Sequence, residues 1–294
     1  MMRTVYVWWW MIGAVLATLG GSSSVQAQAT PGPIMLDYRI YPNANARLEP
    51  DFGPGRSAGK VQVHDYRAIV GFPFVFNDKK TILLPSIDYG LLDLRGDGTL
   101  DPGVEKLHSA MVHMVLVQRL SESWTGLFRL GGGLASDLEG DITQEEFVLT
   151  AMAIASYAFT EDLRVGAGII YDRRTGDVRP LPLINVQLYL NERFRIGGVI
   201  PVLVQAAYRV TPHLTLGLQG SFQGNRYHLD EERYGVDNAE VAYSIIEAGP
   251  TAIVHLGKAL HIQLVSGYTI RRRFEVFLND ESQGNAELDN AFVL

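Results

Sequence analysis

Apolar and polar residues alternate along the stretch from Glu240 to Arg273. Before a short turn at 257–259 the even positions are mostly apolar, and after the turn the even positions are mostly apolar again. A period of two is that of a β-strand with two different faces, whereas a helix repeats after about 3.6 residues. The pattern therefore predicts one long β-hairpin with an apolar face and a polar face.

The same alternation recurs along the chain and predicts further strands, joined by connections of two lengths. The predicted strands are 34–41, 61–76, 83–89, 106–119, 124–135, 147–159, 163–172, 183–190, 194–200, 202–209, 213–225, the two arms of the hairpin, and 288–294. Short turns fall near 77–79, 121–123, 160–162, 191–193, 211–212 and 257–259, and long polar loops near 42–58, 95–105, 136–144, 173–179, 227–238 and 280–287. Short turns that alternate with long loops, and an even number of strands, are the rule in outer-membrane barrels. The count is fourteen strands, or twelve if the terminal elements or the element at Pro201 fail.

Strand length and the two faces of each strand define the predicted fold class. The hairpin strands are longer than the mean strand of soluble proteins, which has about 5–6 residues. A tilted strand crosses a bilayer in roughly 9–11 residues, with its apolar face toward lipid and its polar face toward the lumen. We therefore predict an all-β fold, a transmembrane antiparallel up-and-down β-barrel.

Two residue types mark the ends and irregular points of the predicted strands. Prolines interrupt regular pairing because they lack the N–H group, so a bulge or a strand end is expected at each proline within a strand. These prolines are Pro73, Pro85, Pro182, Pro201 and Pro250. Aromatic residues near strand ends form girdles at the two membrane interfaces of a barrel. The girdle candidates are Tyr41, Phe76, Trp124, Tyr157, Phe159, Tyr171, Tyr189, Tyr208 and Tyr268.

The N-terminus carries an export signal. Arg3 is followed by an apolar run from Val5 to Leu19 and then by small and polar residues, which predicts a cleaved secretory signal peptide at 1–29. An uncleaved anchor is the alternative, but the run is short for one. No other stretch has some 18 consecutive apolar residues, which excludes a helical membrane protein. We therefore expect one barrel domain over residues 30–294.

Composition supports export and argues against nucleic-acid binding. Charged residues make up 19% of the chain, below the roughly 25% of soluble domains. Cysteine is absent, so an exported chain of this kind must be held together without disulfides, as a closed hydrogen-bond ladder can be. The formal net charge is −7, and a nucleic-acid partner would require a basic face.

Charged residues within the predicted strands should face the lumen. A charge that faced the bilayer midplane would cost about 2–4 kcal/mol. The lumen-facing candidates are Asp65, Arg67, Asp88, Arg129, Arg164, Arg209, Gln219 and Glu247. Such residues either form ion-pair networks that plug the lumen or line a path for solutes, and the sequence leaves both open.

The run Arg271-Arg272-Arg273 ends a predicted strand at the outer side of the barrel. Guanidinium groups bind phosphate well, so Arg271, Arg272 and Arg273 are candidate contacts for lipid phosphates. The alternative is that they cap the strand and pair with loop carboxylates such as Asp280 or Glu281.

Metal-binding and catalytic motifs are incomplete. The segment from Asp93 to Asp101 has the spacing of a calcium loop, but Arg95 and Val104 occupy two of its ligand positions. His255 and His261 should pair across the hairpin, but the sequence shows no third metal ligand beside them. The segment GSFQG at 220–224 is not the nucleophile elbow of a hydrolase, although Ser221 and His213 both face the lumen. We therefore predict no metal, no cofactor and no enzymatic activity.

The C-terminal third carries a family resemblance. EAGPTAIVHLGKALHIQLVSGYTIRRRFEVF is followed by LDNAFVL, and the most characteristic piece is Gly-Tyr-x-x-Arg-Arg-Arg-Phe-Glu, from Gly267 to Glu275. On these residues the chain resembles an uncharacterised, domain-of-unknown-function family of Gram-negative outer-membrane β-barrel proteins. The resemblance implies the barrel fold and no particular activity. Barrels of this class usually end in an aromatic residue, whereas this chain ends Phe292-Val293-Leu294, so either Phe292 takes that role or the chain given stops short of it.

These observations predict an integral protein of the outer membrane, with a role as a narrow channel, transport component or structural barrel. The expected partners are outer-membrane lipids, lipopolysaccharide and, during insertion, the barrel assembly machinery. A barrel enzyme that acts on lipid or lipopolysaccharide is one alternative, and a soluble secreted β-sandwich or adhesin module is another. The solute and the oligomeric state stay open.

Overall fold

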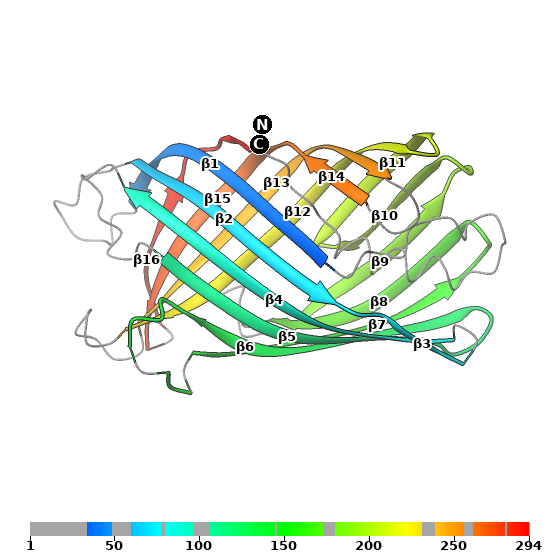
Figure 1. Ribbon diagram of the computed structural model, residues 1–294, viewed down its shortest axis with the longest axis horizontal. Helices are drawn as coiled ribbons and strands as arrows, with labels where there is room; N and C mark the ends of the chain where they lie inside the picture. Colours follow the sequence, from blue (N-terminus) through cyan, green and yellow to red (C-terminus); the bar gives the residue numbers. More distant parts are fainter. Residues whose placement is uncertain are drawn as a thin grey trace.

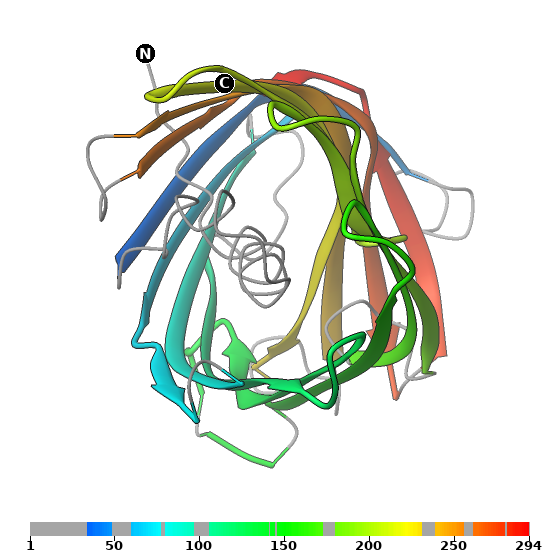
Figure 2. The ribbon, with the colours of Figure 1, turned by 90° about the vertical axis from the view of Figure 1, so that its right-hand side faces the viewer.

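The chain folds into a closed antiparallel β-barrel (Figures 1 and 2). The computed structural model describes residues 34–48, 60–77, 80–96, 106–140, 142–144, 146–172, 180–230, 239–255, 261–279 and 281–293. The predicted all-β barrel is confirmed, whereas the predicted signal peptide at 1–29 lies outside the described residues. Within the described part of the chain, no helix has the length and apolar character needed to cross a membrane.

Seventeen strands in the described residues make up one sheet. They are β1 (Ile34–Leu48), β2 (Lys60–Gly71), β3 (Phe74–Phe76), β4 (Thr81–Gly96), β5 (Lys106–Arg119), β6 (Trp124–Ser136), β7 (Phe147–Ala158), β8 (Leu163–Asp172), β9 (Leu181–Tyr189), β10 (Phe194–Ile200), β11 (Leu203–Thr211), β12 (Leu214–Leu229), β13 (Ala239–His255), β14 (His261–Val265), β15 (Gly267–Leu278), β16 (Glu281–Leu288) and β17 (Phe292–Val293). The ring closes where β1 pairs with β2 on one side and with β16 on the other.

In three places, two consecutive segments pair with the same strand and so form one interrupted strand. β2 and β3 pair with β4 in one register, β14 and β15 both pair with β13, and β16 and β17 both pair with β15. When each of these three pairs is counted as one strand, the seventeen segments of the described residues make a ring of fourteen strands. The two ends of the barrel differ in the length of their connections. We call the end where β1 joins β2, β4 joins β5 and β12 joins β13 the long-connection end, and the opposite end the short-turn end.

Prolines explain two of the three interruptions within strands, the one between β2 and β3 and the one between β14 and β15. The Pro85 carbonyl accepts a hydrogen bond from Phe72 N–H at 3.1 Å, and the Pro250 carbonyl accepts one from Ser266 N–H at 3.2 Å. In an antiparallel ladder the return bond would need the proline N–H, which does not exist. The ladder therefore breaks in the facing strand, at 72–73 and at Ser266.

The proline predictions were thus partly wrong. β4 itself runs through Pro85 with no register shift against β5. Pro73 and Pro201 lie at strand ends, as predicted, and Pro182 is the second residue of β9.

The C-terminal strands differ from the prediction. The stretch 280–287 was predicted as a loop, but Glu281–Leu288 forms β16, and 288–294 is not one strand because β17 covers 292–293 alone. The segment ESQGNAEL has no apolar alternation, so its strand conformation comes from pairing with β15 and not from its own pattern. β1 is also longer than predicted, since it extends to Leu48.

The outer face of the barrel is apolar. Large apolar side chains that are 40% exposed or more point outward from strands around the ring: Ile87, Val112, Met114, Phe128, Leu130, Leu149, Ile169, Ile184, Val204, Leu216, Leu218 and Ile270. The inner face is not uniformly polar. One apolar cluster, the long-connection cluster, lies at the long-connection end and includes Tyr41, Leu94, Leu107, Tyr227, Leu229, Val241, Tyr243 and Ile245. A second cluster on β2 and β4–β10 includes Ile69, Leu84, Val115, Leu127, Met152 and Leu183. Polar side chains occupy the interior between these clusters.

Aromatic residues gather at the short-turn end of the outer face. The Trp124 and Tyr157 rings lie 5.1 Å apart, and the Tyr157 and Phe159 rings lie 5.0 Å apart. The girdle prediction was wrong for Tyr41 and Tyr189, because both side chains lie on the inner face of their strands. Tyr41 is fully buried in the long-connection cluster, and Tyr189 pairs with Arg195 of β10.

Adjacent glycines in β6 offer a test of the fold. A Cβ at Gly133 would lie 2.0 Å from the backbone oxygen of Ala110, whereas a Cβ at Gly132 would meet nothing nearer than 4.0 Å. We expect Gly133→Ala to lower the free energy of unfolding by about 1–3 kcal/mol, the usual cost of overpacking. Gly132→Ala, the matched control, should leave it unchanged. Urea unfolding in detergent or lipid measures both variants, and equal stabilities would contradict this packing.

Candidate functional site in the barrel interior

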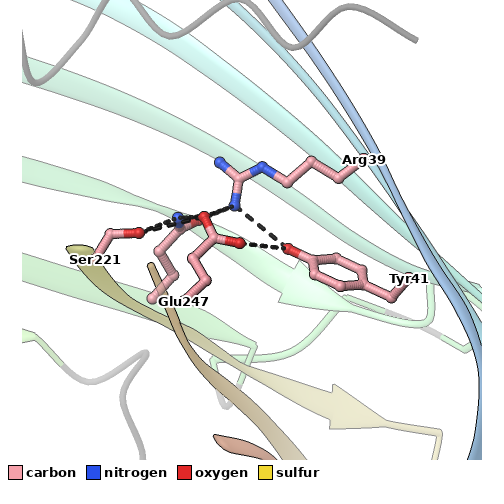
Figure 3. A network of polar contacts seen from close by, with 5 residues as sticks. Arg39, Tyr41, Ser221 and Glu247 are labelled. Carbon is pink, nitrogen blue, oxygen red and sulfur yellow. Dashed lines mark hydrogen bonds and ion pairs between the residues drawn. The ribbon is translucent and has the colours of Figure 1, made fainter. Parts of the chain in front are cut away.

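A network of polar side chains crosses the interior from β1 to β12 and β13 (Figure 3). The Arg39 Nη1 atom donates to Glu247 Oε1 at 3.2 Å and to Gln223 Oε1 at 2.8 Å. The Tyr41 hydroxyl donates to Glu247 Oε2 at 3.5 Å, and the Ser221 hydroxyl donates to Oε1 at 3.2 Å. Glu247 on β13 therefore accepts hydrogen bonds from two other strands, β1 and β12.

The Arg39–Glu247 ion pair is almost completely removed from solvent, with side-chain exposures of 3% and 6%. Both ions lose hydration when buried, and their mutual attraction offsets this loss only if further hydrogen bonds satisfy the remaining atoms. Tyr41, Ser221 and Gln223 supply those bonds on the carboxylate side. The pair ties β1 to strands that are not its neighbours in the ring.

A second chain of charges runs along the inner face of β2, β4, β5 and β6. The Arg67 guanidinium holds both oxygens of Asp88, with the Nε–Oδ1 distance at 2.8 Å. His113 Nε2 lies 3.6 Å from Asp88 Oδ2, and Arg129 Nη2 lies 3.2 Å from His113 Nε2. Asp88 is thus compensated by Arg67, and polar contacts continue from Asp88 through His113 to Arg129 across four adjacent strands.

The remaining predicted lumen residues lie on the same inner face. Asp65 is opposite Arg39 in the β1–β2 register, and Gln219 is buried beside the Ser221–Glu247 bond. Arg164 and Arg209 lie toward the short-turn end, where Arg119 and Arg195 share their face. The short-turn end of the interior is therefore lined by four arginines, which we call the basic lining: Arg119, Arg164, Arg195 and Arg209.

The three consecutive arginines do not act as one group. Arg271 is exposed and pairs with Glu287 at 3.5 Å, and Arg273 pairs with Glu275 at 3.4 Å. Arg272 is 1% exposed and lies on the inner face, because a register shift next to Ile246 puts it opposite buried Ile245. The prediction that Arg272 contacts lipid phosphate was wrong, since the register shift turns it away from the outer surface.

The histidine and acidic motifs carry no metal site in the described residues. His255 is opposite His261, so the predicted pairing is confirmed, but the His261 side chain lies outside the described residues. His255 Nε2 lies 3.2 Å from Thr215 Oγ1. Asp93 pairs with Arg95 at 2.7 Å, and the rest of the calcium-like segment, 97–101, is also outside the described residues. Within the described part, no group of three His, Asp or Glu residues could hold a metal ion.

Ser221 and His213 are not brought together. Ser221 donates to Glu247 in the interior, whereas His213 lies exposed in the turn between β11 and β12. The two residues are eight positions apart along the chain, which spans roughly 27 Å in an extended strand. The arrangement lacks the serine–histidine contact of a hydrolase.

Strands from opposite sides of the ring meet at the long-connection end. β6 and β12 are separated by β7–β11, yet Ser136 bridges His228, and Asp137 N–H donates to the His228 carbonyl at 3.2 Å. The Asp137 carboxylate accepts a hydrogen bond from Asp230 N–H at 3.1 Å. Beside this bridge, burial raises the pKa of the Glu146 carboxyl, which accepts a hydrogen bond from Ser136. We call these contacts the β6–β12 bridge.

Apolar side chains pack below the bridge. Leu107 and Ala135 on one side of the interior and Tyr227, Leu229 and Val241 on the other belong to the long-connection cluster. Main-chain pairing and apolar packing together join opposite sides of the barrel interior at this end. The polar networks lie between these contacts and the basic lining.

The model of the family described as Domain of unknown function (DUF6268) matches residues 96–282. The chain belongs to this DUF6268 family. The matched segment runs from the end of β4 into β16, so it includes both sides of the β6–β12 bridge. No curated protein matched the chain.

Solved porin structures show weak similarity to this DUF6268 barrel. Three variants of the Rhodopseudomonas blastica porin match with TM-scores of 0.24, 0.22 and 0.22 and sequence identities of 6%, 10% and 10%. Each match covers 89% of this chain and 100% of the porin chain.

Several interior residues of the DUF6268 barrel are not among the lumen-facing residues predicted from the sequence. Arg39 and Tyr41 share the odd positions of β1, so the alternation that identified Asp65 and Arg67 would have identified them too. His113 lies among apolar residues of β5, and its charged neighbours come from other strands. The position of Arg272 depends on a register shift that no local pattern reveals.

A double-mutant cycle tests the network that crosses the interior. Glu247→Met leaves the buried Arg39 without its carboxylate, and we expect a loss of about 3–5 kcal/mol in the free energy of unfolding. Replacement of both partners in Arg39→Met with Glu247→Met removes the uncompensated charge and should recover most of that loss. Urea titration of all four forms measures the coupling, and additive effects would show that the pair is not energetically linked.

Proposed function

We propose that this protein is an integral outer-membrane β-barrel that is closed at rest and has no enzymatic activity. The β6–β12 bridge carries this proposal, because an open diffusion pore requires an interior that is continuous from one end to the other. By the loop-length rule of outer-membrane barrels, the closed long-connection end faces outward and the short-turn end faces the periplasm.

The apolar outer face supports insertion in a membrane. Soluble proteins rarely expose contiguous apolar patches larger than a few hundred Å². Here large apolar side chains face outward around the ring, while the charged networks lie inside. This arrangement favours a membrane barrel over the soluble β-sandwich or adhesin module.

The interior favours a structural or gated transport role over the barrel enzyme. Within the described residues, the Ser221 hydroxyl donates its hydrogen bond to Glu247 and not to a histidine. Passage of a solute would require the bridge and the long-connection cluster to separate. The partners we propose are outer-membrane lipids, lipopolysaccharide and the barrel assembly machinery, and of the arginine run only Arg271 and Arg273 stay predicted phosphate contacts.

Substitution on the outer face tests membrane insertion. Leu218 is 65% exposed on the outer face of β12, and Leu138 is 49% exposed in the connection between β6 and β7. We expect Leu218→Arg to cost about 2–4 kcal/mol in lipid vesicles, because the charge faces hydrocarbon. Leu138→Arg should change stability by no more than about 0.5 kcal/mol, as at an ordinary surface site. Two equally tolerated substitutions would argue for a soluble protein.

Conductance in planar bilayers tests the closed state. The wild-type protein should show no steady open-pore current. Replacement of Tyr227 and Leu229 by serine removes apolar packing below the bridge, and we expect frequent conductance steps from this variant. Leu216→Ser with Leu218→Ser changes the outer face of the same strand and is the matched control, which should stay silent. A large steady current from the wild type would contradict the proposal.

A further inference from the structure

Arg272 is an unusual residue for the interior of this barrel. It is the largest of the fully buried side chains in the described residues, with 1% exposure. On its own face it is opposite Ile245 of β13 and Leu288 of β16, both of which belong to the long-connection cluster. A guanidinium group is thus held among apolar neighbours.

The hydrogen-bonding capacity of Arg272 is unused. None of its three guanidinium nitrogens has a hydrogen-bond partner of standard geometry, and neither has the hydroxyl of Tyr243, although the guanidinium and this hydroxyl lie close to each other. The guanidinium carbon lies 5.1 Å from the centre of the Tyr41 ring, which gives a cation–π contact but no charge compensation. A buried charge that lacks a hydrogen-bonded partner is costly, so this group is suited to receive an anion.

The two carboxylates that act on neighbouring Tyr243, Asp65 and Glu247, already interact with other arginines. Glu247 accepts hydrogen bonds from Arg39, Ser221 and Gln223. Arg39 therefore uses the negative charge that Arg272 would otherwise need. Arg272 has no ion pair within the described residues, in contrast to Arg271 and Arg273 on either side of it.

Two different surroundings meet at Arg272. On one side lie the polar groups of the Arg39–Glu247 network, and on the other lie the aromatic and aliphatic side chains of the long-connection cluster. The Tyr243 and Phe274 rings stack there with their centres 4.6 Å apart. A ligand that satisfied both surroundings would have a charged oxyanion head and an apolar body.

The basic lining favours approach of such a ligand from the short-turn end. Its four arginines occupy the inner face of β5, β8, β10 and β11. A charged lining of one sign attracts ligands of the opposite sign and raises their local concentration. Because the long-connection end is closed, the short-turn end is the route that this charge pattern indicates.

We propose that Arg272 and Tyr243 bind the carboxylate or phosphate head of an anionic amphiphile inside the barrel, with its apolar chain against the long-connection cluster. The guanidinium supplies paired N–H donors in the geometry that carboxylate and phosphate oxygens match, and the Tyr243 hydroxyl supplies one more donor. This site goes beyond the proposed function, since it requires neither conductance nor a particular membrane.

Binding of two probes to the full chain in a non-ionic maltoside detergent tests the site. Palmitate carries a carboxylate head and dodecyl phosphate a phosphate head, and titration calorimetry gives the affinity of each. We expect at least one probe to bind the wild type and Arg272→Met to weaken that binding about 10-fold or more, the effect of losing a hydrogen bond to a charged group. Tyr243→Phe should weaken it several-fold, and the probe that binds identifies the source of the head group.

Arg95→Met is the matched control, because it removes the same charge from an exposed position where the arginine pairs with Asp93. It should leave affinity unchanged. Heat-modifiable migration on a gel verifies that every variant is folded, and Arg272→Met should be at least as stable as the wild type because it removes an uncompensated charge. Equal affinity of the wild type and Arg272→Met, absence of binding for both probes, or equally tight binding of neutral dodecanol would each overturn the proposal.

Discussion

The closed antiparallel ladder is the constraint on which the rest of this structure depends. Once the sheet closes into a ring, the side chains of each strand point alternately outward and inward. The outward face carries large apolar residues around the ring. Most of the charges described above on the strands then lie inside, and the interior has to compensate charges that come from many strands at once.

The interior meets this requirement with separate layers. At the long-connection end, apolar side chains and the β6–β12 bridge join opposite sides of the barrel. In the middle, Arg39 pairs with Glu247 across the interior, and Arg67 pairs with Asp88 along the wall. At the short-turn end, arginines line the wall. This order from apolar to paired to basic gives the interior a direction, which a uniformly polar pore would lack.

The sequence alone was sufficient for the features that depend on local alternation. The β5, β8 and β10 boundaries, the His255–His261 pairing of the hairpin and the inward direction of Asp65, Arg67 and Asp88 all follow from a period of two. The features that depend on contacts between distant strands were missed. β16 has a polar sequence and becomes a strand through its pairing with β15, and Arg272 turns inward through one register shift. β6 and β12 pair at residues some ninety positions apart in the sequence, and no local pattern predicts this contact.

Closure at the long-connection end is the central claim, and a disulfide trap tests it most directly. The chain has no cysteine, so Ser136→Cys with His228→Cys introduces the only pair of thiols. These two positions are opposite each other in the β6–β12 bridge, within reach of a disulfide. A mild oxidant should cross-link this pair rapidly in intact membranes, and should leave the control, Ser136→Cys with Leu218→Cys, unlinked. Failure of the first pair to cross-link, in protein that migrates as a folded barrel, would show that the two strands do not meet.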